Sequence, residues 1–170
     1  MRMTVVAVAI SLTVIGASAS ADSPSSTSSS RSIPLDLPLG KYRFSGRCTK
    51  MLRVKEDLPN KCLDYMGAIV RQPRSATFVF PAVDGAWLYT VSRPGVRAAD
   101  GTAITYQVET MVDLAIERKF VGGECVMRIR QERPIVHCTT WQYSNKVGVL
   151  RDVVFVGDGK WEFGAPEPTI

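Results

Sequence analysis

The sequence is poor in the residues and motifs on which most catalytic sites depend. It contains a single histidine, His137, so a Ser-His-Asp or Cys-His mechanism would have to use that residue. It also lacks a G-x-S-x-G nucleophile elbow, a glycine-rich phosphate loop and a calcium-binding loop. We therefore predict no catalytic residue and no cofactor, and interpret the chain as non-enzymatic.

Long hydrophobic runs are equally scarce. The longest, residues 5–15, follows a short start whose one charge is Arg2. It is shorter than the roughly 20 apolar residues that a membrane-spanning helix needs. Small residues follow at 16–21, so residues 1–21 are predicted to be a cleavable signal peptide, with an uncleaved N-terminal anchor as the alternative. We expect an exported protein, periplasmic or secreted, with no transmembrane segment after cleavage.

The remainder, about 150 residues, suits one domain. Residues 22–39 are rich in Ser and Pro. Such a segment buries too little apolar surface to offset its ordering entropy, which predicts a flexible linker. Residues 165–170 resemble it and are predicted to be a loose tail. The folded domain is therefore expected at residues 40–164.

Two long segments within that domain alternate between apolar and polar residues, as half-buried strands do. In the first, residues 41–55, the even positions are mostly apolar. Its odd positions form a largely cationic face with Lys41, Arg43, Arg47, Arg53 and Lys55. The second, residues 104–116, is too long for a usual strand, so we expect a bend or bulge near Thr110. Its polar side would place Asp113 and Glu117 on a solvated surface.

Shorter strand-like segments fill most of the rest. They lie at 77–80, 86–91, 124–130, 135–143, 149–156 and 160–163, and residues 63–70 are either a strand or a short helix. Turn sequences separate them, including Gly157-Asp158-Gly159. This spacing predicts an all-β fold, a single antiparallel β-barrel or β-sandwich.

The chain has four cysteines. An even count in an exported chain predicts two disulfides, for which three connectivities exist. A hairpin over residues 124–143 would place Cys125 opposite Cys138 on an apolar face, so register and hydrophobic pattern agree. By elimination, Cys48 pairs with Cys62.

A metal site is the alternative role for these cysteines. His137-Cys138 with Met127 nearby offers soft ligands of the kind that suit Cu(I). The hairpin points His137 away from the sulfurs, and no C-x-x-C motif is present. We therefore predict no metal ligands.

Basic residues supply the one surface feature that predicts binding. The net charge is +5 at pH 7, short of a dedicated nucleic-acid binder. If the outward faces of the first strand and the hairpin adjoin, they form a basic patch for an anionic partner. The alternative is an ordinary charged surface. The predicted binding residues are Arg43, Arg47, Arg53, Arg128, Arg130 and Trp141.

Three functions are consistent with this sequence. The leading one is an exported binding module, such as an inhibitor or an envelope-associated factor, with a protein, glycan or other anionic envelope partner. The second is a hydrolase using two carboxylates. Its candidate residues are Asp84, Asp100, Glu109, Asp113 and Glu117.

The third function is a carrier of small apolar ligands. Gly40-Lys41-Tyr42 resembles the G-x-W opening of lipocalins, with Tyr42 in place of Trp. A lipocalin-like barrel would imply an open interior. The resemblance covers three residues, and no residue role is carried over from it.

Overall fold

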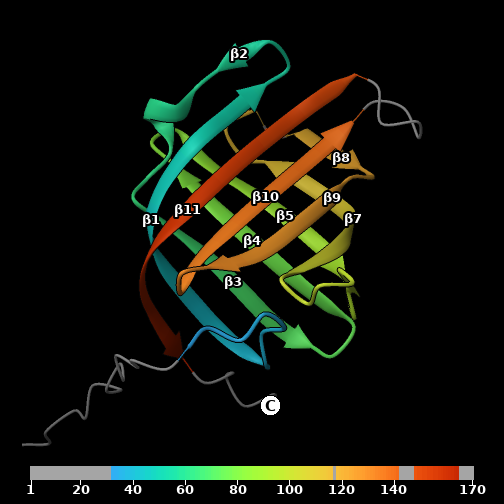
Figure 1. Cartoon of the computed structure of the whole chain (residues 1–170). Coiled ribbons are helices and arrows are strands. Elements are labelled where there is room, and N and C mark those ends of the chain that lie inside the picture. Colours follow the sequence, from blue (N-terminus) through green and yellow to red (C-terminus); the bar gives the residue numbers. More distant parts are fainter. Residues whose placement is uncertain (1–31, 117, 142–147, 165–170) are drawn as a thin grey trace, which may run out of the picture.

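Strands make up most of the computed structural model, which describes residues 32–116, 118–141 and 148–164 (Figure 1). The strands are β1 (Gly40–Arg53), β2 (Glu56–Asp57), β3 (Tyr65–Gln72), β4 (Ser75–Ala82), β5 (Gly85–Ser92), β6 (Val96–Arg97), β7 (Ala103–Asp113), β8 (Arg118–Val121), β9 (Glu124–Arg130), β10 (Arg133–Trp141) and β11 (Val149–Gly164). A short 3-10 helix, η1 (Pro59–Lys61), follows β2. The predicted signal peptide and tail lie outside the described residues. The described part contains no helix with the length and apolar character needed to cross a bilayer.

The strands form a closed antiparallel barrel of eight strands, with the short β2, β6 and β8 attached. Their order is β1-β3-β4-β5-β7-β9-β10-β11, and β11 pairs back onto β1 to close the ring. The predicted all-β antiparallel fold is confirmed. Of the two predicted architectures, a barrel or a sandwich, the structure has the barrel. The ambiguous residues 63–70 lie largely in strand β3.

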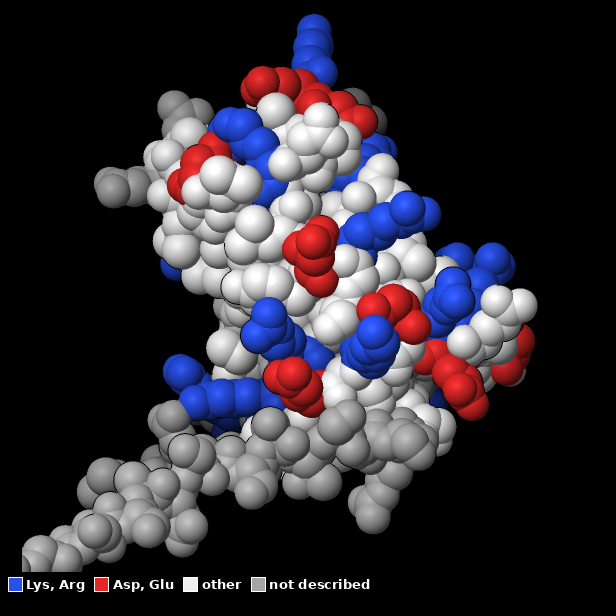
Figure 2. Space-filling view, turned by 90° about the vertical axis from the view of Figure 1, so that its left-hand side faces the viewer, with Lys and Arg blue, Asp and Glu red and all other residues white. Residues whose placement is uncertain are grey.

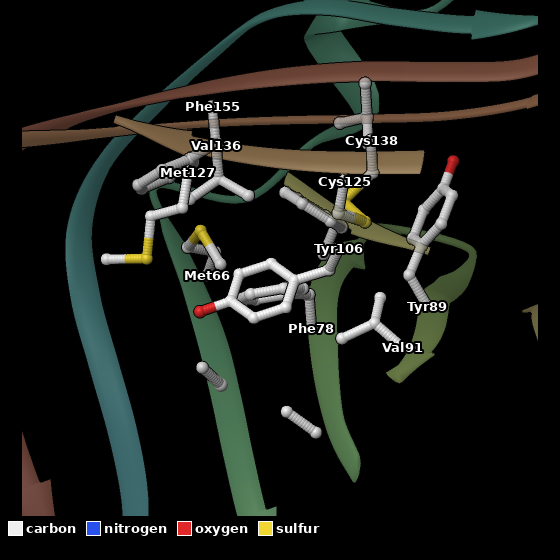
Figure 3. Packing of buried hydrophobic residues seen from close by; sticks show 14 of the residues in the cluster. Met66, Phe78, Tyr89, Val91, Tyr106, Cys125, Met127, Val136, Cys138 and Phe155 are labelled. Carbon is white, nitrogen blue, oxygen red and sulfur yellow. A yellow bond between two sulfur atoms is a disulfide. The ribbon is translucent and has the colours of Figure 1, made fainter. Parts of the chain in front are cut away.

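Both predicted disulfides are present. Strands β9 and β10 pair in the expected register, with Cys125 directly opposite Cys138. These two residues are fully buried beside Tyr89 and Tyr106 (Figure 3). Cys48 of β1 is bonded to Cys62, which follows η1. The pairing that we inferred from register and elimination is confirmed.

The expected irregularity in β7 is also present. The β5–β7 register shifts between Thr110, opposite Thr90, and Val108, opposite Val91. An inserted residue reverses which face of the sheet the later side chains occupy. Asp113 consequently points inward with an exposed fraction of 0%. Its predicted place on a solvated surface is wrong.

Strand β1 undergoes the same reversal. Its pairing with β11 shifts between Phe44 and Gly46 and again between Cys48 and Lys50. Beyond the second shift Met51 is buried, and Arg53 reaches Asp113 in the interior. The prediction that Arg53 belongs to the outer cationic face is therefore wrong, because the bulges end the simple alternation.

Strand β11 runs through the position where a turn was expected. Phe44 pairs with Trp161 and Gly46 with Gly157, so residues 158–160 bulge opposite the single residue Ser45. A side chain at Gly157 would lie 2.6 Å from the Pro134 ring, and only glycine fits there. The Gly-Asp-Gly sequence makes a bulge within one long strand.

Residues 32–39 pack across one end of the barrel, the lower end in Figure 1. Ile33 and Leu37 are buried in the hydrophobic core. Arg93 donates hydrogen bonds to Asp36 Oδ1 (2.8 Å) and to the Leu37 carbonyl (2.9 Å). This part of the segment that we predicted as a flexible linker is an ordered closure of the barrel.

Candidate functional site

The structure brings Arg47 and Arg128 to the same outer face of the barrel. Arg47 of β1 pairs with Val156, Val156 with Ile135, and Ile135 with Arg128 of β9. The two exposed arginines therefore lie at the two ends of one row of side chains that crosses four strands. With about 4.8 Å between strands, their backbones lie about 14 Å apart. Two half-buried apolar side chains lie between them.

The other predicted binding residues are more dispersed. Arg43 is exposed and its guanidinium lies 4.1 Å from the centre of the Tyr65 ring. Trp141 is half-buried at the far end of β10 from the hairpin that carries Arg130. The predicted patch thus divides, and its hairpin part lines a concave site.

That concave site is a groove of about 430 Å³. It is lined by Ala98, Asp100, Thr102, Ala103, Arg128, Ile129 and Arg130. We call it the arginine groove. Ala103 of β7 is paired directly with Arg128 of β9, which brings the loop before β7 against the β9–β10 hairpin.

The electrostatics of the arginine groove favour an anion. Asp100 accepts hydrogen bonds from the backbone nitrogen and hydroxyl of Thr102, at 3.0 and 2.9 Å. These bonds, and to a smaller extent the charge of Arg128, hold the pKa of Asp100 below its ordinary value. Arg128 and Arg130 form no ion pair with any carboxylate in the described part of the chain. Two guanidiniums against one carboxylate leave the groove positively charged.

The surface around β1 differs from this groove. Figure 2 shows the left-hand side of Figure 1, where β1 lies. Basic and acidic side chains are interspersed on this face, and neither sign dominates it. The cationic residues of β1 therefore do not make a continuous basic patch here.

His137 takes part in an outer cluster whose geometry does not suit nucleophilic catalysis. Its Nε2 lies 2.7 Å from Asp152 Oδ1 and 3.0 Å from Thr139 Oγ1. A catalytic triad uses one imidazole nitrogen for the carboxylate and the other for the nucleophile. In this cluster Asp152 and Thr139 both contact the same nitrogen, Nε2 of His137. Lys50 Nζ also binds Asp152, at 2.5 Å.

The carboxylates proposed for a hydrolase are not brought together. Asp84, in the β4–β5 turn, and Asp100, before β7, lie at opposite ends of the barrel. Asp84 is paired with Lys61, whose hydrogen bond holds the pKa of the carboxyl below its ordinary value. Glu109 accepts a hydrogen bond from Ser92, and Glu117 lies outside the described residues. The described residues contain no group of three or more His, Cys, Asp or Glu that could hold a metal ion.

A further cluster, which the sequence analysis missed, lies inside the upper end of the barrel in Figure 1. Arg151 Nε donates a 2.8 Å hydrogen bond to Asp113 Oδ2, and Arg53 Nε lies 3.3 Å from the same oxygen. The Arg151 guanidinium also lies 4.7 Å from the centre of the Phe120 ring. We call this cluster the polar end. Its members are Arg53, which is partly exposed, and the buried residues Trp87, Tyr89, Asp113, Thr140 and Arg151.

Together these features define the class of the protein as a disulfide-bonded, closed antiparallel β-barrel with ordered packing at both ends. Comparison with protein-family models, with curated proteins and with solved structures finds no match for the chain.

Proposed function

We propose that the chain is an exported, non-enzymatic binding protein that holds an anionic partner in the arginine groove. The observation that carries this proposal is the pair Arg128 and Arg130, two exposed guanidiniums without a described ion pair that line one groove of about 430 Å³. Planar guanidiniums bind carboxylate, phosphate and sulfate groups through paired hydrogen bonds.

The surroundings of the groove favour a chain-like partner over a single ion. Ile129, Ala98 and Ala103 supply apolar walls beside the two charges. The row from Arg128 through Ile135 and Val156 ends at Arg47, a third exposed cation about 14 Å away. An acidic glycan or similar polyanion could contact the groove and Arg47 together, and the two outer-face apolar residues would pack against its less polar parts.

Export is supported by the disulfides. Disulfides persist in oxidising compartments and are rare in the cytosol. Two of them in one barrel agree with the predicted signal peptide. The periplasmic space or the extracellular medium is accordingly the proposed location.

A carrier of small apolar ligands remains the second candidate function, and it would need an open cavity inside the barrel. The side chains whose packing would oppose an open lumen are Tyr42, Phe44, Tyr106 and Met127, and all four are buried in the core cluster. These buried side chains belong to one core cluster inside the barrel, and we therefore favour the surface groove as the binding site.

The proposal is tested by calorimetric titration of residues 22–170 with heparin and with polygalacturonate at several salt concentrations. We expect binding that weakens as salt rises. Arg128→Glu with Arg130→Glu should weaken it at least tenfold. The control is Arg74→Glu, an exposed arginine in the β3–β4 turn, which should change it less than twofold. Equal affinity in both variants, or no binding to either polymer, would overturn the proposal.

A further inference from the structure

We propose that the polar end of the barrel interior is a second binding site, for one small monovalent anion that accepts hydrogen bonds, either an inorganic ion or a carboxylate. This site is separate from the arginine groove and does not depend on the proposed function. Three properties of the polar end support this site: its charge, its unpartnered donors and its geometry.

The charge of the polar end is unbalanced. Its two guanidiniums, Arg53 and Arg151, share the single carboxylate of Asp113. Asp152, the neighbouring acid on β11, is engaged on the outer face by Lys50 and His137. Among the residues that the structure describes, one positive charge is therefore left without a carboxylate, in a site where the side chains of Arg151 and Asp113 are 2% and 0% exposed. An uncompensated charge so far from water is costly, and an anion would compensate it.

Hydrogen-bond donors are also in excess. Trp87 Nε1, the Tyr89 hydroxyl and Thr140 Oγ1 are buried and have no hydrogen-bond partner among the described residues. Arg53 Nε likewise makes no hydrogen bond, although it lies 3.3 Å from Asp113. Buried polar groups in native proteins are nearly always paired, so each exception requires an explanation. Burial is the main reason why the pKa of the Tyr89 hydroxyl lies well above its ordinary value, so this hydroxyl remains protonated.

These groups converge from two facing walls. Arg53, Arg151 and Thr140 are successive cross-strand neighbours on β1, β11 and β10. Trp87 and Asp113 are cross-strand neighbours on β5 and β7. Arg151 bridges the walls, because it binds Asp113 and its guanidinium lies 5.7 Å from the centre of the Trp87 ring. Figure 3 shows the Tyr89 hydroxyl pointing away from Tyr106.

The chemistry of the ligand follows from this arrangement. An indole N–H only donates and a guanidinium only donates, so the missing partner must accept. The excess charge of one favours a monovalent anion over a neutral acceptor. The buried core beside the polar end favours a small one. Arg53 is the one charged member with appreciable exposure, at 18% of its side chain, and it marks the route of entry.

The test uses the mature chain, residues 22–170, at constant ionic strength. We expect the midpoint of thermal unfolding to rise with the concentration of bromide, acetate or formate. The rise should have the concentration dependence expected for a ligand that binds only the folded state. Gluconate, which is too large, should produce no such rise. Comparing bromide with the carboxylates identifies which source of anion the site accepts. Crystals grown with bromide should show its anomalous signal within hydrogen-bond distance of Arg53, Tyr89 or Thr140.

Two shape-conserving variants separate binding from folding. Tyr89→Phe and Thr140→Val each remove one unpartnered donor and should weaken the bromide effect at least threefold while the barrel still folds. Thr90→Val, on the outer face, should leave the bromide effect unchanged. A polar end occupied by water alone in bromide crystals, with unfolding midpoints that do not distinguish bromide from gluconate, would refute the proposal.

Discussion

Arg151 and Asp113 form an ion pair inside the barrel, with Nε and Oδ2 2.8 Å apart and neither side chain more than 2% exposed. The pair joins the last strand to β7 across the interior. Removing one member of a buried pair leaves the other charge without compensation. The pair is therefore a sensitive point for the stability of the barrel.

Asp113→Asn should lower the free energy of unfolding by about 3–5 kcal/mol, because Arg53 and Arg151 would then share no carboxylate. Urea denaturation measures this loss. Asp84→Asn is the matched control, since it breaks a surface pair with Lys61 and should cost about 1 kcal/mol or less. Similar losses in the two variants would show that the interior pair has no special role.

The two disulfides should differ in their contribution to stability. Their sequence separations are 14 and 13 residues, so the constraint on the unfolded chain is nearly equal, about 2–4 kcal/mol each. Replacing Cys125 and Cys138 by Ala should nevertheless cost more than replacing Cys48 and Cys62, because the first pair is fully buried and leaves a cavity. Denaturant titration of the two double variants tests this order.

Leu37 and Leu39 provide a paired test of the closure formed by residues 32–39. Leu37 is 3% exposed and Leu39 is 42% exposed. Leu37→Ala should lower the free energy of unfolding by about 2–5 kcal/mol. Leu39→Ala should change it by about 0.5 kcal/mol or less. If both variants unfold like the parent chain, the closure does not stabilise the barrel.

Asp152 should contribute to stability in a pH-dependent way. Burial alone would raise the pKa of its carboxyl, but hydrogen bonds from His137 and Lys50, with their charges, hold that pKa below its ordinary value. The contribution is then complete above about pH 5 and is lost as pH falls below about 4, through the folded-state pKa. Asp152→Asn should flatten the stability curve in this acidic range. A curve of unchanged shape would contradict the assignment.

The buried tyrosines should ionise at a higher pH than tyrosines exposed to solvent. Burial is the main cause that raises the pKa of Tyr106 to about 12. A raised pKa stabilises the fold below about pH 10, and this contribution is lost as pH rises through the folded value. Ultraviolet absorbance titration should show Tyr106 ionising near pH 12 in the folded chain, with Tyr106→Phe as the assignment control. Its ionisation near pH 10 in folded protein would contradict the expected burial.

The barrel and its disulfides could be predicted because several local signals agreed. The alternation in β9 and β10, the turn between them and the cysteine positions all required the same register. The inward faces of Arg53 and Asp113 could not be predicted in this way. A bulge changes the direction of every later side chain in a strand, and the shift in β1 between Cys48 and Lys50 is not marked by a glycine or proline.

The candidate site was predicted only in part. Arg128 and Arg130 follow directly from the hairpin, but their groove depends on the loop before β7, which reaches them through long-range pairing. The order of residues 32–39 has a signal in the sequence. Ile33, Leu35, Leu37 and Leu39 alternate with other residues there, and Ser and Pro in the segment obscured that pattern.

The pairing of β1 with β11 has a consequence for how the chain acquires its structure. The first and last strands of the barrel are neighbours, with Lys41 opposite Gly164. When the N-terminal part of the chain becomes available for folding first, one edge of β1 stays unpaired until residues 149–164 are also available. Such high contact order slows folding, and an open strand edge is a template for aggregation. A chaperone that shields β1 during delivery would therefore raise the yield of native protein more than one that acts after the last strand has joined.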